Sequence, residues 1–282
     1  MAITESQKEK ARLLLSLHTR GDLLILPNVW NPLGARILQA KGYPAVATAS
    51  AAVSSSLGYE DGEKIKRSTL IDIIGRIARS VDVPVTADIE AGYGKTVSEL
   101  EETAREVIDS GVVGINIEDG LEEGNALRPL DAQCQRISAV RQVAARRDVH
   151  LVINARIDSY QSSSFAGNAE ATEEAVSRAK AYAEAGADCI YPMGPGDEET
   201  VRVLRARIDA PLNILGTPIA APLPVLEAIG INRVSFGPLV LRSCLRKFVD
   251  IADVLMKKGD HSCFSDMLSM KEAGEYLLEG PE

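Results

Sequence analysis

The sequence predicts an α/β protein, a (β/α)8 barrel with a leading N-terminal helix and an extra C-terminal helix. Short apolar runs alternate with amphipathic helical segments, and about eight such units fit into 282 residues. The apolar runs are almost uninterrupted, as in parallel strands that are covered on both faces. A doubly wound open sheet is the weaker alternative, because no G-x-G-x-x-G motif follows the first apolar run.

The alternation assigns the elements in order. Strands are expected over residues 23–29, 45–50, the first part of 83–94, 114–119, 151–156, 189–192, 212–215 and 233–237. Helices are expected over 4–20, 32–42, 68–80, 97–110, 130–147, 171–185, 198–208, 223–229 and 239–258, the last of these as the final helix of the barrel, and over 264–278 in the tail. A long connection covers 54–62. We expect one domain over 1–282, with the leading helix in 1–22, the barrel in 23–258 and a helical extension in 259–282.

Local signals support these boundaries. Gly21 and Gly111 stand where the first helix and the helix over 97–110 must stop. Asn31 is a good N-cap, and Pro32 suits the first position of the helix that follows it. The tail helix carries an apolar stripe that is surplus to the barrel, and such a stripe folds back or packs on another subunit.

Composition excludes several classes of protein. A net charge of −9 argues against nucleic acid or an anionic membrane as the main partner. The four cysteines form no C-x-x-C pair, which argues against a zinc site or a disulfide framework and favours a reduced compartment. The N-terminus has no apolar signal segment, and no run is long enough to cross a membrane. The expectation is a cytoplasmic protein.

The stretch 83–94, VPVTADIEAGYG, is the centre of the prediction. It opens as a β-branched strand and closes in a glycine-rich loop, with Asp88 and Glu90 at the transition. Side chains alternate along a strand, so these two acids are expected on one face. Such a pair repels unless a cation or proton lies between them, and its oxygen ligands suit Mg²⁺. The alternatives are that both acids are solvated loop charges or that Asp88 only braces the turn.

Other polar residues fall at the same end of the predicted barrel, where barrel enzymes carry their chemistry. Asp61 and Glu118 can converge there with Asp88 and Glu90, and Arg156 is the arginine among them. A divalent cation with an anionic substrate accounts for this charge, with Arg156 holding a carboxylate in two hydrogen bonds. The alternative for Arg156 is an ion pair with Glu118. No His, Cys or Lys falls at the C-terminal end of a predicted strand, which argues against a histidine base, a thiol nucleophile or a Schiff base.

Four segments taken together, ATASAAVSSSLGYEDGE, VTADIEAGYG, GINIEDG and INARID, resemble the isocitrate lyase/phosphoenolpyruvate mutase superfamily over nearly the whole chain. The resemblance implies a barrel that uses Mg²⁺, or Mn²⁺ in its place, on small 2-oxo or 2-hydroxy acids. It also implies a homo-oligomer, a dimer or tetramer in which the helix after the barrel is exchanged between subunits.

The resemblance also assigns roles to residues. Asp88 resembles the direct metal ligand, and Asp61, Glu90 and Glu118 resemble acids that reach the ion mainly through water. Arg156 resembles the arginine that binds the substrate carboxylate. The backbone at Ala49, Ser50 and Ala51 resembles the segment that cradles the oxyanion end of the substrate. Catalytic roles are expected for Arg156, Asp61 and Glu118.

The segment after the fourth strand, residues 120–129, departs from the superfamily. It reads GLEEGNALRP and lacks the Cys-Gly-His motif of the isocitrate lyases and the lysines of the phosphonomutases. Asn125 is its candidate substrate contact. We therefore expect a lyase that cleaves or decarboxylates a small 2-oxo or 2-hydroxy dicarboxylate through a pyruvate-enolate-like intermediate. The alternatives are a phosphonate-acting mutase or hydrolase and a catalytically degenerate barrel that binds a small anion.

Overall fold

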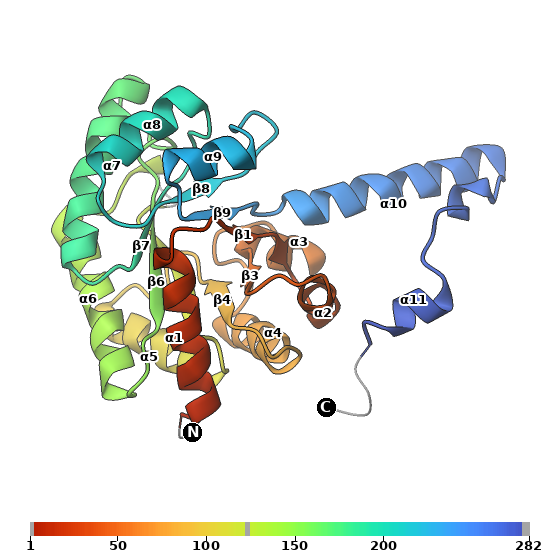
Figure 1. The fold of residues 1–282 in the computed structure, drawn as a ribbon, viewed down its shortest axis with the longest axis horizontal. Coiled ribbons are helices and arrows are strands. Elements are labelled where there is room, and N and C mark those ends of the chain that lie inside the picture. The colour runs from red at the N-terminus through yellow and green to blue at the C-terminus, as the bar shows by residue number, and fades with distance from the viewer. Residues whose placement is uncertain (1–2, 122–124, 278–282) are drawn as a thin grey trace.

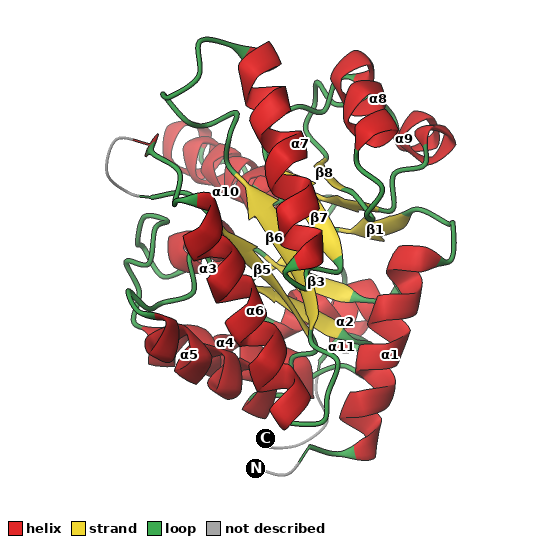
Figure 2. Ribbon diagram, turned by 90° about the vertical axis from the view of Figure 1, so that its left-hand side faces the viewer, coloured by secondary structure: helices red, strands yellow, loops and turns green. Residues whose placement is uncertain are grey.

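The computed structural model describes residues 3–121 and 125–277, and it shows parallel strands enclosed by helices (Figures 1 and 2). The strands are β1 (Leu24–Leu26), β2 (Asn28–Val29), β3 (Val46–Thr48), β4 (Val85–Asp88), β5 (Gly114–Glu118), β6 (Val152–Ile157), β7 (Cys189–Pro192), β8 (Asn213–Leu215) and β9 (Arg233–Ser235). The helices are α1 (Glu5–Thr19), α2 (Pro32–Ala40), α3 (Ser50–Ser56), α4 (Arg67–Arg79), α5 (Val97–Asp109), α6 (Leu130–Arg146), α7 (Asn168–Glu184), α8 (Glu198–Arg207), α9 (Leu223–Ile229), α10 (Leu239–Lys258), the 3₁₀ turn η2 (Ser262–Phe264) and α11 (Met270–Gly274).

The strands form the predicted barrel in two arcs. One arc runs β2-β3-β4-β5-β6-β7 and the other β1-β9-β8, with every pairing parallel. A parallel bridge between Ile190 and Leu212 joins the arcs on one side. On the other side the joint is Pro27, which lies between β1 and β2 and has no N–H to continue the ladder. The strand expected over 23–29 is therefore one barrel position in two pieces.

Asn28 holds the barrel together at this proline break. Its side-chain amide donates to the Thr48 carbonyl at 2.7 Å, which ties β2 to β3. Its side-chain oxygen accepts the backbone N–H groups of Phe236 and Gly237 at 2.7 and 2.9 Å, just beyond β9. The buried side chain thus replaces ladder bonds that Pro27 cannot make, and it does so at the C-terminal ends of the strands.

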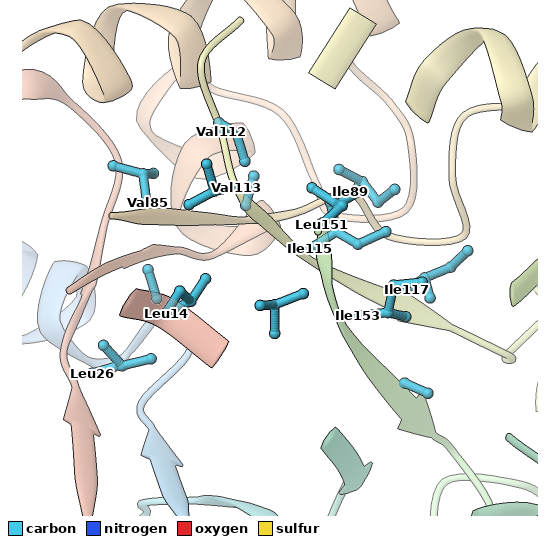
Figure 3. Close-up of a cluster of buried hydrophobic side chains, with 14 of the residues drawn as sticks. Leu14, Leu26, Val85, Ile89, Val112, Val113, Ile115, Ile117, Leu151 and Ile153 are labelled. Atoms are coloured by element: carbon cyan, nitrogen blue, oxygen red, sulfur yellow. The ribbon is translucent and has the colours of Figure 1, made fainter. Parts of the chain in front are cut away.

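The core fills the barrel and the layer under the helices, and Figure 3 shows part of it. Helix α1 closes the N-terminal end. Gln7 bonds the carbonyl of Ile108 and Asn232 bonds that of His18, so α1 touches the turns that lead into β5 and β9. Leu14 is fully buried, and a Cβ on Gly114 would come within 2.6 Å of it. A glycine there lets the helix seal the barrel.

Most predicted boundaries agree with the structure, and two of the differences bear on the site. Asn31 caps α2 with Pro32 at its first position, as predicted. The strand expected over 45–50 ends at Thr48, and Ser50 begins the helix α3 inside what was expected to be strand and long connection. The helix predicted over 171–185 already begins at Asn168.

The C-terminal part differs more. Helix α10 has the predicted bounds, but it projects away from the barrel (Figure 1) and buries only Leu241. The long tail helix predicted over 264–278 is wrong: within the described residues this stretch forms the end of η2 and the five-residue helix α11. Its last residue, Leu278, lies outside the described residues. Large apolar side chains such as Phe248, Met256 and Met270 are exposed on α10 and the tail.

His18 gives the fold a dependence on pH. Its Nδ1 lies 2.8 Å from the Leu14 carbonyl, and its Nε2 is buried with no partner among the described residues. Burial and the nearby charge of Arg233 lower the pKa of His18 to about 4. Because the unfolded chain takes up this proton near pH 6.5, the stability that neutral His18 contributes is present above pH 6.5 and lost as pH falls toward 4.

We expect the free energy of unfolding to fall by up to roughly 3 kcal/mol over this window because of His18. The variant His18→Gln should lose this part of the pH dependence, and His261→Gln, at an exposed tail position, should keep it. Urea unfolding between pH 4 and 7 measures both. Equal slopes for wild type and His18→Gln would contradict the assignment.

Candidate active site

Two adjoining cavities open at the C-terminal ends of the strands, and Arg156 lines both. The inner cavity has a volume of about 60 Å³, and its wall includes Ala49, Ser50, Ala51, Asp61, Asp88 and Arg156. The outer cavity has a volume of about 570 Å³, and its wall includes Glu63, Glu90, Glu118, Asn125, Arg128, Arg156 and Asp158. The predicted site residues are thus brought to one end of the barrel, but they are divided between two cavities.

Asp88 ends β4 and is held by the start of α3. Its Oδ2 accepts the backbone N–H of Ser50 at 3.1 Å and the Ser50 hydroxyl at 3.0 Å. Its own N–H donates to the Thr48 hydroxyl at 3.0 Å. The helical turn at Ser50 therefore fixes the orientation of the Asp88 carboxylate. Ala49, Ser50 and Ala51 line the inner cavity, and the Ser50 N–H donates to Asp88.

Asp61 reaches the same cavity from the loop after α3. Burial and the charge of Asp88 raise the pKa of Asp61, while a hydrogen bond with Ser50 and the charge of Arg156 oppose the shift. Two carboxylates that share a small cavity in this way are a hard-oxygen donor set of the kind that Mg²⁺ binds. Among the described residues, no group of three or more His, Cys, Asp or Glu side chains is arranged to hold a metal ion.

Glu90 does not follow the predicted alternation. Strand β4 stops at Asp88, and Glu90 has a φ of 54°, in the left-handed region. Its Oε2 accepts the N–H groups of Gly62, at 2.7 Å, and Glu63, and its Oε1 accepts the Tyr93 hydroxyl at 2.6 Å. Glu90 thus fastens the loop that carries Asp61, and it lines the outer cavity. Burial, against these hydrogen bonds, raises the pKa of Glu90 to about 7.

Arg156 lies between two acids. Its Nη1 is 2.6 Å from Glu118 Oε2 and its Nε is 2.7 Å from Asp158 Oδ1. The predicted alternative for Arg156, an ion pair with Glu118, is therefore present. Burial raises the pKa of Glu118 to about 8 with the help of Asp158, Asp88 and Asp61, against the charge of Arg156. Nη2 of Arg156 has no partner among the described residues, so a ligand carboxylate can still reach it.

A buried hydrogen-bond network around Asp119 holds Asp158, the partner of Arg156, in position. Asp119 follows β5, and its Oδ2 accepts the Tyr182 hydroxyl at 2.6 Å and Arg178 Nη1 at 3.0 Å. Its Oδ1 accepts the backbone N–H of Asp158 at 2.9 Å. Helix α7 thereby fixes the position of Asp158, and Asp158 in turn fixes Arg156.

The loop after β5 folds back on itself. Gly120 pairs with Leu127 in an antiparallel bridge, and the N–H of Arg128 donates to the Asp119 carbonyl at 2.8 Å. Asn125 lines the outer cavity with a φ of 50°. Residues 122–124, in the loop that differs from the superfamily, lie outside the described residues.

Sequence reasoning missed two residues of the outer cavity region. Tyr93 stands in the quoted glycine-rich loop, but its bond to Glu90 depends on left-handed backbone at both residues, which no local pattern announces. Arg128 precedes Pro129 at the start of α6 and looks like a surface residue in the sequence. Only the fold shows that it lines the cavity.

Fold and site together define a (β/α)8 barrel whose mouth gathers carboxylates around one arginine. The phosphoenolpyruvate phosphomutase family model matches residues 14–256. A 2-methylisocitrate lyase from Aeropyrum pernix is 32% identical over 267 residues, which cover 90% of this chain and 82% of the relative. The chain therefore belongs to the phosphoenolpyruvate phosphomutase family, within the superfamily that the sequence predicted.

Solved structures agree with this fold. A Burkholderia cenocepacia protein with a provisional lyase/mutase assignment has a TM-score of 0.89 and 27% identity, covering 97% of both chains. A phosphonopyruvate hydrolase in complex with oxalate and Mg²⁺ has a TM-score of 0.82 over 95% of this chain and 94% of its own, at 22% identity. None of the described helices is long and apolar enough to cross a membrane.

The variant Tyr93→Phe removes the hydroxyl that donates to Glu90 Oε1. Because Glu90 is buried, the lost donor should lower the free energy of unfolding by about 1–2 kcal/mol. The matched control is Tyr59→Phe at an exposed position, where we expect almost no change. Urea unfolding compares the two variants, and an equally small effect of both would show that the Tyr93–Glu90 bond does not hold the loop.

Proposed function

We propose that this protein is a Mg²⁺-dependent lyase that breaks a carbon–carbon bond in a small 2-oxo or 2-hydroxy dicarboxylate. The observation that carries the proposal is the inner cavity, where Asp61 and Asp88 face Arg156. The family membership supports a carbon–carbon lyase, and the choice of substrate class is our inference from the charges of the site.

The metal would be held by Asp88 directly, with Asp61, Glu118 and Glu90 acting mainly through water. Once bound, Mg²⁺ supplies Lewis-acid polarisation of the oxygens of a 2-oxo or 2-hydroxy carboxylate. Mn²⁺ is an alternative ion with the same preference for oxygen ligands. Ser50 holds the Asp88 carboxylate in place, so the ligand geometry is organised before the ion arrives.

The chain's own residues would then position the substrate. Arg156 offers Nη2 to the substrate carboxylate while Glu118 and Asp158 keep its guanidinium in one orientation. In a 2-oxo acid, the electron pair of the broken bond becomes the carbon–carbon double bond of a pyruvate-like enolate, and the π pair of the carbonyl moves onto its oxygen. In a 2-hydroxy acid, the hydroxyl proton must leave, the carbinol carbon becomes a carbonyl carbon, and the departing carbon takes the electron pair of the broken bond and then a proton.

Glu118 is our candidate for carrying a proton in this reaction. It lies beside Arg156 in the outer cavity, and its pKa of about 8 is close to the pH at which a general acid or base works best. Asp61, whose pKa is also raised, is the second candidate. Asn125 would contact the substrate from the loop after β5.

We also propose that the active form is a homo-oligomer, a dimer or tetramer. Helix α10 leaves the barrel with exposed apolar side chains such as Leu245, Phe248 and Val249 (Figure 1). A second copy is the partner that such a face fits, and the exchange implied by the resemblance would involve α10 together with the tail. The inner cavity includes Pro238, directly before α10, so the arm begins at the site itself.

The test is consumption of oxaloacetate, 2-methylisocitrate, dimethylmalate and phosphonopyruvate in the presence of Mg²⁺, with the products of each identified. We expect turnover of at least one carbon–carbon substrate, and Asp88→Asn should reduce it by about 100-fold or more because a ligand charge is lost. The same variant should lose the rise in melting temperature that Mg²⁺ gives the wild type. The control Asp72→Asn, on the exposed side of α4, should retain both.

The outcomes separate the candidate functions. Turnover of phosphonopyruvate alone would favour the phosphonate-acting alternative. Stabilisation by Mg²⁺ without turnover of any substrate would favour a degenerate, anion-binding barrel. Full activity of Asp88→Asn would refute the metal site.

A further inference from the structure

Arg128 lies in the wall of the outer cavity and has no counter-ion among residues 3–121 and 125–277. Its side chain is half-buried, and it forms no hydrogen bond or ion pair with any described residue. Its Nε atom is buried and has no partner. Burying guanidinium N–H groups without acceptors costs free energy, so a residue left in this state points to an anion that binds from the cavity.

The neighbouring arginines differ from Arg128 in that their terminal nitrogens have acceptors, although the Nε of Arg136 is also buried without a partner among the described residues. Arg136 donates to the Gly94 carbonyl at 3.2 Å and to that of Ala91. Arg178 is paired with Asp119 at 3.0 Å. Burial and the charge of Arg128 lower the pKa of Arg136 to about 10, and the charge of Glu63 opposes this shift. The guanidinium groups of Arg128 and Arg136 are therefore close enough to repel each other.

The acids of the outer cavity do not supply the missing partner, because each is already used. Glu118 and Asp158 bond Arg156. Glu90 accepts from the Tyr93 hydroxyl and from two backbone N–H groups. Glu63 accepts the backbone N–H of Tyr93 at 2.7 Å. None of these acids is bonded to Arg128, so its guanidinium, like Nη2 of Arg156, is open to an acceptor that enters the cavity.

We propose that Arg128 binds a second carboxylate of the substrate, on the fragment that departs when the carbon–carbon bond breaks. The inference builds on the proposed function, in which the first carboxylate is held at Arg156. Because Arg156 lines both cavities and Arg128 only the outer one, a substrate that bridges them has its reacting end inside and its second carboxylate outside.

This assignment narrows the substrate class. A substrate that releases only carbon dioxide leaves nothing for Arg128 to bind. A 2-hydroxy acid whose departing fragment keeps its own carboxylate would use both arginines, and 570 Å³ is within the range of cavities that enclose small ligands. Arg128 is therefore a specificity-determining residue for substrates that split into two carboxylic acids.

The test measures two ligands on the intact protein with Mg²⁺. Oxalate probes the inner cavity, and succinate, added when oxalate is saturating, probes the outer one. We expect Arg128→Gln to weaken succinate binding by about tenfold or more while oxalate binding is unchanged, since a charge-assisted hydrogen bond is lost. Arg128→Lys should restore part of the affinity, and the exposed control Arg202→Gln should bind both ligands as the wild type does.

Calorimetry measures the affinities for oxalate and for succinate. The two affinities test the proposed function and the role of Arg128 separately. Oxalate binding by Arg128→Gln shows that the variant is folded. If oxalate binds and succinate affinity is the same in Arg128→Gln and wild type, or succinate merely competes with oxalate, the role of Arg128 is overturned. If the wild type binds no oxalate with Mg²⁺, the proposed function itself fails.

Discussion

Crowding of carboxylates around Arg156 is the constraint on which the rest of the site depends. Parallel strands bring Asp88, Glu118 and Asp158 to one end of the barrel, and the loop after α3 adds Asp61. Buried acids of this kind need a cation, a proton or a hydrogen-bond donor each. Arg156 pairs with two of the acids, Glu118 and Asp158, and backbone N–H groups donate to Asp88 and Glu90. These partners do not fully offset burial, and the pKa values of Asp61, Glu90 and Glu118 are raised.

The solution divides the mouth of the barrel into two chemical environments. The inner cavity keeps acids whose charge is only partly met, which is where a divalent ion belongs. The outer cavity keeps acids that are already bonded and one arginine that is not. The two environments share Arg156. Glu90, which has a left-handed backbone, belongs to the outer environment, and its carboxylate is bonded to Gly62, Glu63 and Tyr93.

Much of the barrel could be predicted because its signals are local. The apolar runs and the cap formed by Asn31 and Pro32 depend on neighbours in the sequence, and Asp88 and Arg156 follow from strand ends. The turn at Ser50 could not be predicted, because it is fixed by a contact with Asp88, far away in the chain. The tail failed for a different reason: a short amphipathic segment needs a surface to pack on before it becomes a long helix.

The position of α1 has a practical consequence. Because this helix seals the N-terminal end of the barrel through Leu14, the start of the chain lies at the pole opposite the two cavities. A purification tag or a solid support joined there would leave the mouth facing the solvent. A fusion at the C-terminus would be attached beyond α10 and could obstruct the surface on which we expect a second copy to pack.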